Sequence, residues 1–106
     1  MKVEHYTYRV TWSEKEGEFV GLCAELPSLS HFDDTREQAL AGIVELVRVA
    51  VEMMREQGQE PPEPIASKDY SGKFLVRLPP HVHRTLAIEA AEQGVSLNRL
   101  VASKLG

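Results

Sequence analysis

The sequence has 106 residues, of which 42% are hydrophobic and 26% are charged, with a formal net charge of −4 and one cysteine. This apolar content is too high for a disordered chain, and the apolar runs are too short to cross a bilayer. The single cysteine, Cys23, excludes an internal disulfide and a cysteine-based zinc knuckle. No apolar stretch follows Lys2 to form a secretory signal, so we expect a cytoplasmic protein without membrane contact.

The overall charge hides an asymmetry along the chain. Residues 1–60 hold six Lys and Arg against twelve Asp and Glu, whereas residues 72–106 hold five against two. The front is therefore acidic, with a net charge of −6, and the tail is basic, with a net charge of +3. Such halves indicate partners of opposite sign, nucleic acid for the tail and a basic protein for the front, although ordinary surface variation would also account for the difference.

The first third of the chain has the patterns of β-strands. Aromatic and apolar residues alternate with polar ones at Tyr6, Tyr8, Val10 and Trp12, which predicts a half-buried strand. A polar turn ending in Gly17 and an apolar run over 19–26 complete a predicted hairpin, and residues 29–32 are long enough for a short third strand. We expect Tyr8, Trp12 and Cys23 to lie in the core; the alternative is that Tyr8 and Trp12 anchor a partner on an uncovered face of the sheet.

A long amphipathic helix is predicted from Thr35 to about Gln57. Its apolar residues recur at spacings of three and four on one broad face: Ala39, Leu40, Ile43, Val44, Val47, Ala50, Val51 and Met54. Residues 35–38 fit a capping box, in which the side chains of Thr35 and Gln38 each bind the other residue's backbone amide, and Gly58 ends the helix. The front is thus an α+β domain over residues 1–60, with a three- to four-stranded antiparallel sheet and one long helix.

Three prolines within residues 61–64 prevent the helix from continuing. We expect a Pro-rich linker over 61–71, in which Ile65 could add a fourth, edge strand to the front sheet. The linker separates the front domain from a tail domain over residues 72–106.

The tail has the order strand, helix, helix. Residues 73–78 predict a strand, Pro79 and Pro80 open a helix that runs to about Gln93, and Ser96 caps a second helix over 97–105. A lone strand and about 35 residues cannot bury enough surface to fold alone, so we expect a dimer in which the strand pairs with its own copy. This pairing turns the dimer core inward (Phe74, Val76 and Leu78) and the other residues outward (Lys73, Leu75 and Arg77).

The run from Gly72 to Leu86 and the turn Gly94-Val95-Ser96-Leu97-Asn98 resemble the ribbon-helix-helix family of DNA-binding proteins. Together with the acidic front and the Pro-Pro-Glu-Pro-Ile segment, the whole chain is similar to HicB-type antitoxins. The resemblance implies a truncated ribonuclease H-like front that blocks a HicA-type mRNA-cleaving toxin, and a tail that represses its operon. Many members carry an Asp-Leu-Pro-Gly-Cys-like segment where this chain has residues 25–29, Glu-Leu-Pro-Ser-Leu, so no toxin-contact residue is assigned.

A two-stranded ribbon fits the major groove of operator DNA, where Arg77 can donate twice to guanine. Lys73 can reach guanine or a phosphate, and Leu75 offers an apolar contact. The amides of Leu97 and Asn98, with Ser96 as the cap, are suited to gripping a phosphate. The alternative interpretations are a solvated strand face and a plain helix cap.

For an enzyme, the front would need converging groups, and the candidates are His5, Glu25, His31, Asp33 and Asp34. The two aspartates directly precede the Thr35 cap, where the helix dipole favours negative charge whatever the function. His81 and His83 are two residues apart on a helix and so point to different sides. We therefore expect no catalytic residue, metal or cofactor.

The sequence is interpreted as a non-enzymatic antitoxin and autorepressor that forms dimers through the ribbon and could associate further into tetramers. One alternative is a stand-alone ribbon-helix-helix repressor whose front is an oligomerisation or ligand-sensing domain. Another is an active nuclease, which would bind a divalent ion at Asp33 or Asp34.

Overall fold

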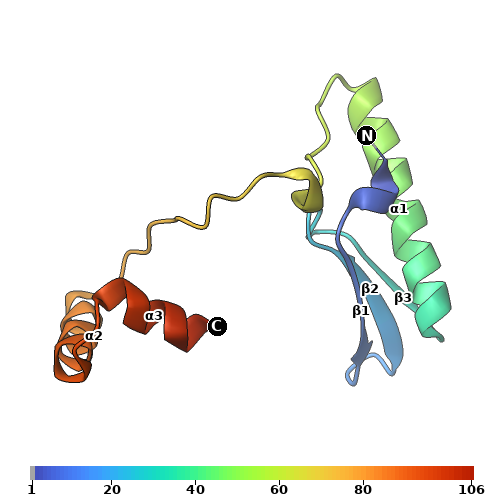
Figure 1. Ribbon diagram of the computed structural model, residues 1–106. Helices are drawn as coiled ribbons and strands as arrows, with labels where there is room; N and C mark the ends of the chain where they lie inside the picture. Colours follow the sequence, from blue (N-terminus) through green and yellow to red (C-terminus); the bar gives the residue numbers. More distant parts are fainter. Residues whose placement is uncertain (1) are drawn as a thin grey trace. The chain divides into compact units, whose positions relative to one another are not determined.

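The structure is a computed structural model that describes residues 2–106. The chain divides into two compact units, the first ending at Tyr70 and the second running from Ser71 to Gly106 (Figure 1). The first unit contains the sheet and the longest helix, and the second contains two shorter helices.

Three antiparallel strands form the sheet of the first unit in the order β1-β2-β3. They are β1 (Tyr8–Ser13), β2 (Glu18–Cys23) and β3 (Ser30–Asp33), which confirms the hairpin and the short third strand. The register pairs Tyr8 with Cys23 at one end of β1 and Trp12 with Phe19 at the other. A short 3-10 helix, η1 (Val3–His5), precedes β1.

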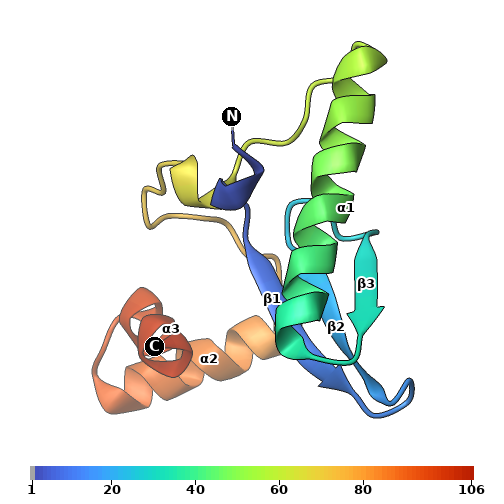
Figure 2. The same cartoon turned by 90° about the vertical axis from the view of Figure 1, so that its right-hand side faces the viewer.

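The helix α1 (Arg36–Glu56) covers one face of this sheet (Figure 2). It is capped by Thr35, whose side chain accepts from the Gln38 amide at 3.1 Å, so one half of the predicted capping box forms. Close contact with the sheet requires Gly21 in β2, because a Cβ atom there would lie 2.5 Å from the Ala39 carbonyl oxygen. The helix and the sheet enclose the core residues Val3, Tyr6, Cys23, Ile43, Val47 and Val51.

The predicted core is confirmed for Tyr8 and Cys23 but wrong for Trp12. Tyr8 packs against the core and its hydroxyl donates to the Val3 carbonyl at 2.8 Å. Trp12 is 49% exposed, because it sits at the far end of the hairpin, where its ring makes a T-shaped contact with Phe19 and its indole nitrogen donates to the Glu14 carboxylate at 2.5 Å. Leu40 is exposed as well, so the buried face of α1 contains fewer residues than the apolar face predicted from the sequence.

The prediction of a fourth strand at Ile65 is wrong, since Ile65–Ser67 form the short 3-10 helix η2. The preceding prolines bring this segment back to the first unit rather than leaving it in solvent. Pro64 is buried, and the Tyr6 hydroxyl donates to the Pro62 carbonyl at 2.6 Å. Much of the expected linker over 61–71 is thus attached to the first unit.

The second unit contains α2 (Pro80–Gln93) and α3 (Leu97–Leu105), with boundaries as predicted. Gly94 ends α2 with φ +69°, a left-handed conformation that residues with a side chain rarely adopt. The buried residues of the second unit are Ala90 of α2 and Leu100 of α3. Residues 73–79 form no strand within the single chain, because no other segment pairs with them.

Candidate functional site

The segment that precedes α2 is the most exposed apolar stretch of the described chain. Phe74 is 79% exposed and Leu75 is 80% exposed, and Val76 and Leu78 are also exposed. Burying such side chains would gain roughly 1.5–3 kcal/mol each. This apolar segment therefore stays unpaired within residues 2–106.

Local hydrogen bonds fix the start of this segment. The Lys73 amide donates to the Ser71 hydroxyl oxygen at 3.1 Å, and the Ser71 hydroxyl donates to the Lys73 carbonyl at 3.3 Å, around Gly72. Beyond this turn, neither Lys73 nor Arg77 has an ion-pair partner among residues 2–106. Both cations are therefore available to an external anion.

The beginning of α3 presents a second group of polar atoms. The Ser96 hydroxyl oxygen accepts from the Arg99 amide at 3.1 Å, which confirms that Ser96 is the N-cap. Asn98 is exposed and Leu97 is half-buried. The amides of the first turn of α3 and its positive dipole end suit an anionic group. Within one chain, no hydrogen bond or ion pair among residues 2–106 joins this group to Lys73 or Arg77.

In the first unit, Glu25 acts as a clamp rather than as a free carboxylate. One oxygen accepts from the Thr7 amide at 2.8 Å, and the other accepts from the Ile65 amide at 2.9 Å. Burial raises the pKa of Glu25, but the backbone amides of Ile65 and Thr7 outweigh it, so the pKa lies below its ordinary value. Glu25 thereby holds the start of β1 and the Pro-rich segment together.

The other acidic candidates also have structural partners. The Asp33 carboxylate contacts the His31 ring nitrogen at 3.0 Å and accepts from the Asp34 amide at 2.9 Å. The hydrogen bond from His31 lowers the pKa of Asp33. Because Asp33 pairs with Phe19 and Glu25 follows Cys23, the two carboxylates lie at opposite ends of β2. Among residues 2–106, no cluster of three potential metal ligands occurs.

Of the remaining candidates, His5, His81 and His83 form none of these contacts, whereas the Cys23 thiol lies beside the Glu25 clamp and donates to a Glu25 oxygen at 3.6 Å. His5 ends η1, and His81 and His83 are exposed on α2. Burial raises the pKa of the Cys23 thiol, which is 1% exposed and free. A buried thiol with a raised pKa is a poor nucleophile and behaves as an apolar core residue.

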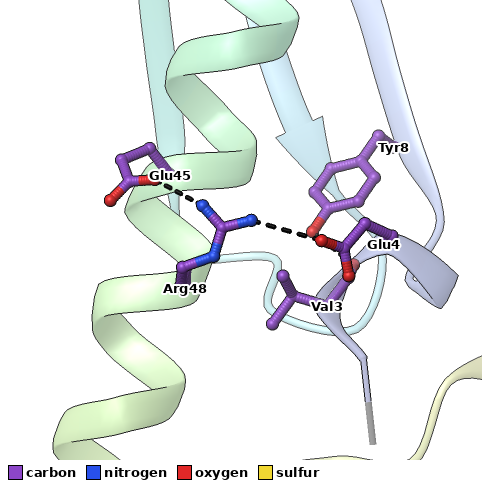
Figure 3. A network of polar contacts seen from close by, with 5 residues as sticks. All are labelled: Val3, Glu4, Tyr8, Glu45 and Arg48. Carbon is purple, nitrogen blue, oxygen red and sulfur yellow. Dashed lines mark hydrogen bonds and ion pairs between the residues drawn. The ribbon is translucent and has the colours of Figure 1, made fainter.

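One surface network ties the N-terminus to α1. The Arg48 guanidinium lies between Glu4 of η1, at 3.3 Å, and Glu45, one turn earlier on α1 (Figure 3). The bonds to Glu45 and Glu4 raise the pKa of Arg48, and a backbone hydrogen bond, followed by the charge of Arg48, lowers the pKa of Glu4. Arg48 is thus neutralised on the side of α1 that faces η1.

Two features of the first unit were not predicted from the sequence. The clamp at Glu25 joins residues that are 40 positions apart, and no local sequence pattern predicts such a contact. Three exposed apolar residues of α1, Leu46, Val49 and Met53, were also missed. The sequence could have indicated them, because the apolar residues of α1 occupy a wider arc of the helix than a single buried face needs.

Taken together, the residues define a two-unit protein: an acidic α+β unit, and a basic unit of one extended segment and two helices. No helix of the described residues is long and apolar enough to span a membrane. A model of the HicB family matches residues 51–105, slightly more than half of the chain. The chain therefore belongs to the HicB family, an antitoxin family. No curated protein and no solved structure shows significant similarity to it.

Proposed function

We propose that this chain is the antitoxin of a type II toxin-antitoxin pair, which binds and silences a HicA-type mRNA-cleaving toxin and represses its own operon. The observation that carries the proposal is the HicB family match over residues 51–105. It spans the end of α1, the Pro-rich segment and the whole of α2 and α3. The protein acts in the cytoplasm, and it works by binding rather than by catalysis.

The first unit is proposed to bind the toxin on a truncated ribonuclease H-like framework. Residues 1–70 hold seven Lys and Arg against fourteen Asp and Glu, a net charge of −7. A protein that cuts mRNA needs a basic surface to hold the phosphate backbone, so an acidic unit would attract it and compete with RNA. The carboxylates Glu25 and Asp33 are occupied by protein partners, which favours a binding role over a nuclease centre.

The second unit is proposed to bind operator DNA as a ribbon-helix-helix dimer. Pairing of residues 73–78 with the same segment of a second chain would bury Phe74, Val76 and Leu78 as the dimer core. It would turn Lys73, Leu75 and Arg77 outward as a ribbon for the major groove. The exposure of this whole segment in one chain supports the pairing.

The beginning of α3 is proposed to hold a DNA phosphate. Leu97 and Asn98 would offer their backbone amides to the phosphate. Ser96 is the N-cap of α3 and so holds this first turn in place. These contacts would position the dimer, whereas Arg77 would read the bases. Higher oligomers, such as tetramers, would form through contacts of the first unit.

The proposal is tested by purifying the tagged full-length chain together with the small protein encoded beside it. Cleavage of RNA by that partner is then measured with and without this chain. We expect the partner to co-purify, to cut RNA alone and to be silenced in the complex. A partner that does not bind, or that cuts RNA equally well in the complex, would refute the antitoxin role.

A further inference from the structure

The helix α1 carries an apolar stripe that residues 2–70 leave partly exposed. Leu46, Val49 and Met53 are 36%, 44% and 52% exposed. Their spacing of three and four residues places them on one side of the helix. We call these three residues the α1 stripe. Single exposed apolar residues are common, but a continuous row over two helical turns indicates a contact surface.

The stripe lies on the side of α1 that faces the β3 edge. His31 of β3 packs against Gly42, which is four residues before Leu46 and therefore on the same side of the helix. However, β3 has four residues whereas α1 has 21. The C-terminal half of α1 extends past the strand, with no element beside it on that side (Figure 2). The sheet is thus too short to cover the stripe.

The border of the stripe is acidic. Glu45, Glu52 and Glu56 lie four before, three after and seven after Val49, so they follow the stripe along its solvent side. The neighbouring cations Arg48 and Arg55 lie toward η1, where both line a hollow with Glu4, and Glu4 and Glu45 bind Arg48. An apolar centre with a charged border is the usual composition of a protein interface. Here the border selects a partner with positive charge.

The same border disfavours a second copy of this chain. A two-fold contact uses the same surface on both molecules, so the carboxylates beside one stripe would meet those beside the other. Like charges placed together in an interface weaken association strongly. A basic partner would instead meet opposite charges around the apolar centre.

We propose that the α1 stripe is the centre of the docking surface for the basic protein partner of this antitoxin. The inference rests on the proposed function and assigns the contact to one side of one helix. Three side chains cover only part of a stable interface, which buries about 800 Å² per partner. The acidic border and the β3 edge supply the remaining contact area.

The test compares Val49→Lys with Leu40→Lys in the full-length chain. Both wild-type side chains are 44% exposed and both lie on α1, but they are nine residues apart and so lie on opposite sides of the helix. The binding constant for the small basic protein encoded beside this chain is measured by calorimetry. Circular dichroism verifies that each variant is folded, and Met53→Lys replaces Val49→Lys if the latter does not fold.

We expect Val49→Lys to weaken binding about tenfold or more, because it places a cation against a basic surface, and Leu40→Lys to change it less than about threefold. If Val49→Lys and Met53→Lys bind as tightly as wild type, the stripe is not the docking surface although the antitoxin role stands. If wild type does not bind the partner, the proposed function itself fails. If Val49→Lys instead changes the sedimentation of the chain alone, the stripe is covered by a second copy and the inference is overturned.

Discussion

Removing the carboxylate of Glu25 should destabilise the first unit and release the Pro-rich segment. Glu25 accepts hydrogen bonds from the Thr7 and Ile65 amides at 2.8 and 2.9 Å, and from the Thr7 hydroxyl at 3.2 Å. A hydrogen bond to a charged group contributes about 1.5–3 kcal/mol, and about 1 kcal/mol where water has partial access. We therefore expect Glu25→Ala to lower the free energy of unfolding by about 2 kcal/mol. Glu25→Gln keeps one acceptor oxygen and should lose about half of that.

Urea unfolding followed by tryptophan fluorescence measures this effect. Trp12 is the only tryptophan of the sequence and lies in β1, so its emission reports on the first unit alone. Glu16→Gln is the matched control, since Glu16 lies in the exposed hairpin turn and its carboxylate has no hydrogen-bond partner among residues 2–106. Limited proteolysis between residues 58 and 72 gives a second measurement, and cleavage should be faster in Glu25→Ala.

The effect should also depend on pH in a defined direction. Because the pKa of Glu25 in the folded protein is lower than its ordinary value of 4.5, its carboxylate stabilises the fold fully above that value. The contribution is lost as pH falls through the lowered pKa of the folded protein. The difference between wild type and Glu25→Gln should thus be constant near neutral pH and shrink below about pH 4.5. Equal unfolding midpoints for wild type and Glu25→Ala at pH 7, with unchanged proteolysis, would refute the clamp.

Two further predictions concern the second unit. Arg77→Ala should weaken specific operator binding by about 1–3 kcal/mol while the dimer stays intact, as measured by gel shift and sedimentation, and an unchanged footprint and affinity would remove Arg77 from base reading. Val76→Asp should place two carboxylates in the paired ribbon and convert the dimer to monomer in sedimentation equilibrium; a dimer of unchanged strength would show that residues 73–78 do not pair.

The sequence predicted best the features that a few neighbouring residues decide. The Thr35 and Ser96 caps and the end of α2 at Gly94 depend on one side chain or one backbone angle, and each occurs where it was expected. The strand periodicity likewise located β1 and β2. Such local signals act within one helical turn or one strand, so they can be recognised without knowledge of the fold.

The errors arose where burial depends on the extent of a neighbouring element. Trp12 continues the alternation of Tyr8 and Val10, but it lies at the end of the hairpin, where little covers it. Leu46, Val49 and Met53 continue the apolar pattern of α1 but run beyond the short strand β3. Periodicity gives the direction in which a side chain points, whereas the length of the opposite layer decides whether it is covered.

Contacts between distant residues were beyond any local pattern. Residues 61–65 were interpreted as a linker or an edge segment, in which Ile65 could add a short strand to the sheet. The Glu25 carboxylate instead binds its amide across 40 residues of sequence, and Ile65 enters the 3-10 helix η2. For the same reason the sequence placed the end of the front domain at residue 60, whereas the first compact unit extends to Tyr70.

This difference in boundary leads to a direct comparison of two fragments. A fragment of residues 1–59 lacks the bond from the Tyr6 hydroxyl to Pro62, the bond from the Ile65 amide to Glu25 and the buried Pro64. Two hydrogen bonds at about 1 kcal/mol each and one buried proline at about 1 kcal/mol amount to about 3 kcal/mol. Because a domain of about 60 residues has little stability to lose, residues 1–70 should unfold cooperatively in urea, whereas residues 1–59 should be largely unfolded or should melt at much lower urea.

Neither fragment contains the segment 73–78, so neither should bind operator DNA. Trp12 fluorescence and circular dichroism at equal protein concentration make the comparison, with Glu25→Ala in the longer fragment as a control that removes the bonds to Glu25 from Ile65, Thr7 and the Cys23 thiol but keeps those of Pro62 and Pro64. The free energy of unfolding of this control should lie between the values for the two fragments. If residues 1–59 are as stable as residues 1–70, the Pro-rich segment is a passive linker and its contacts with Tyr6 and Glu25 contribute nothing to folding.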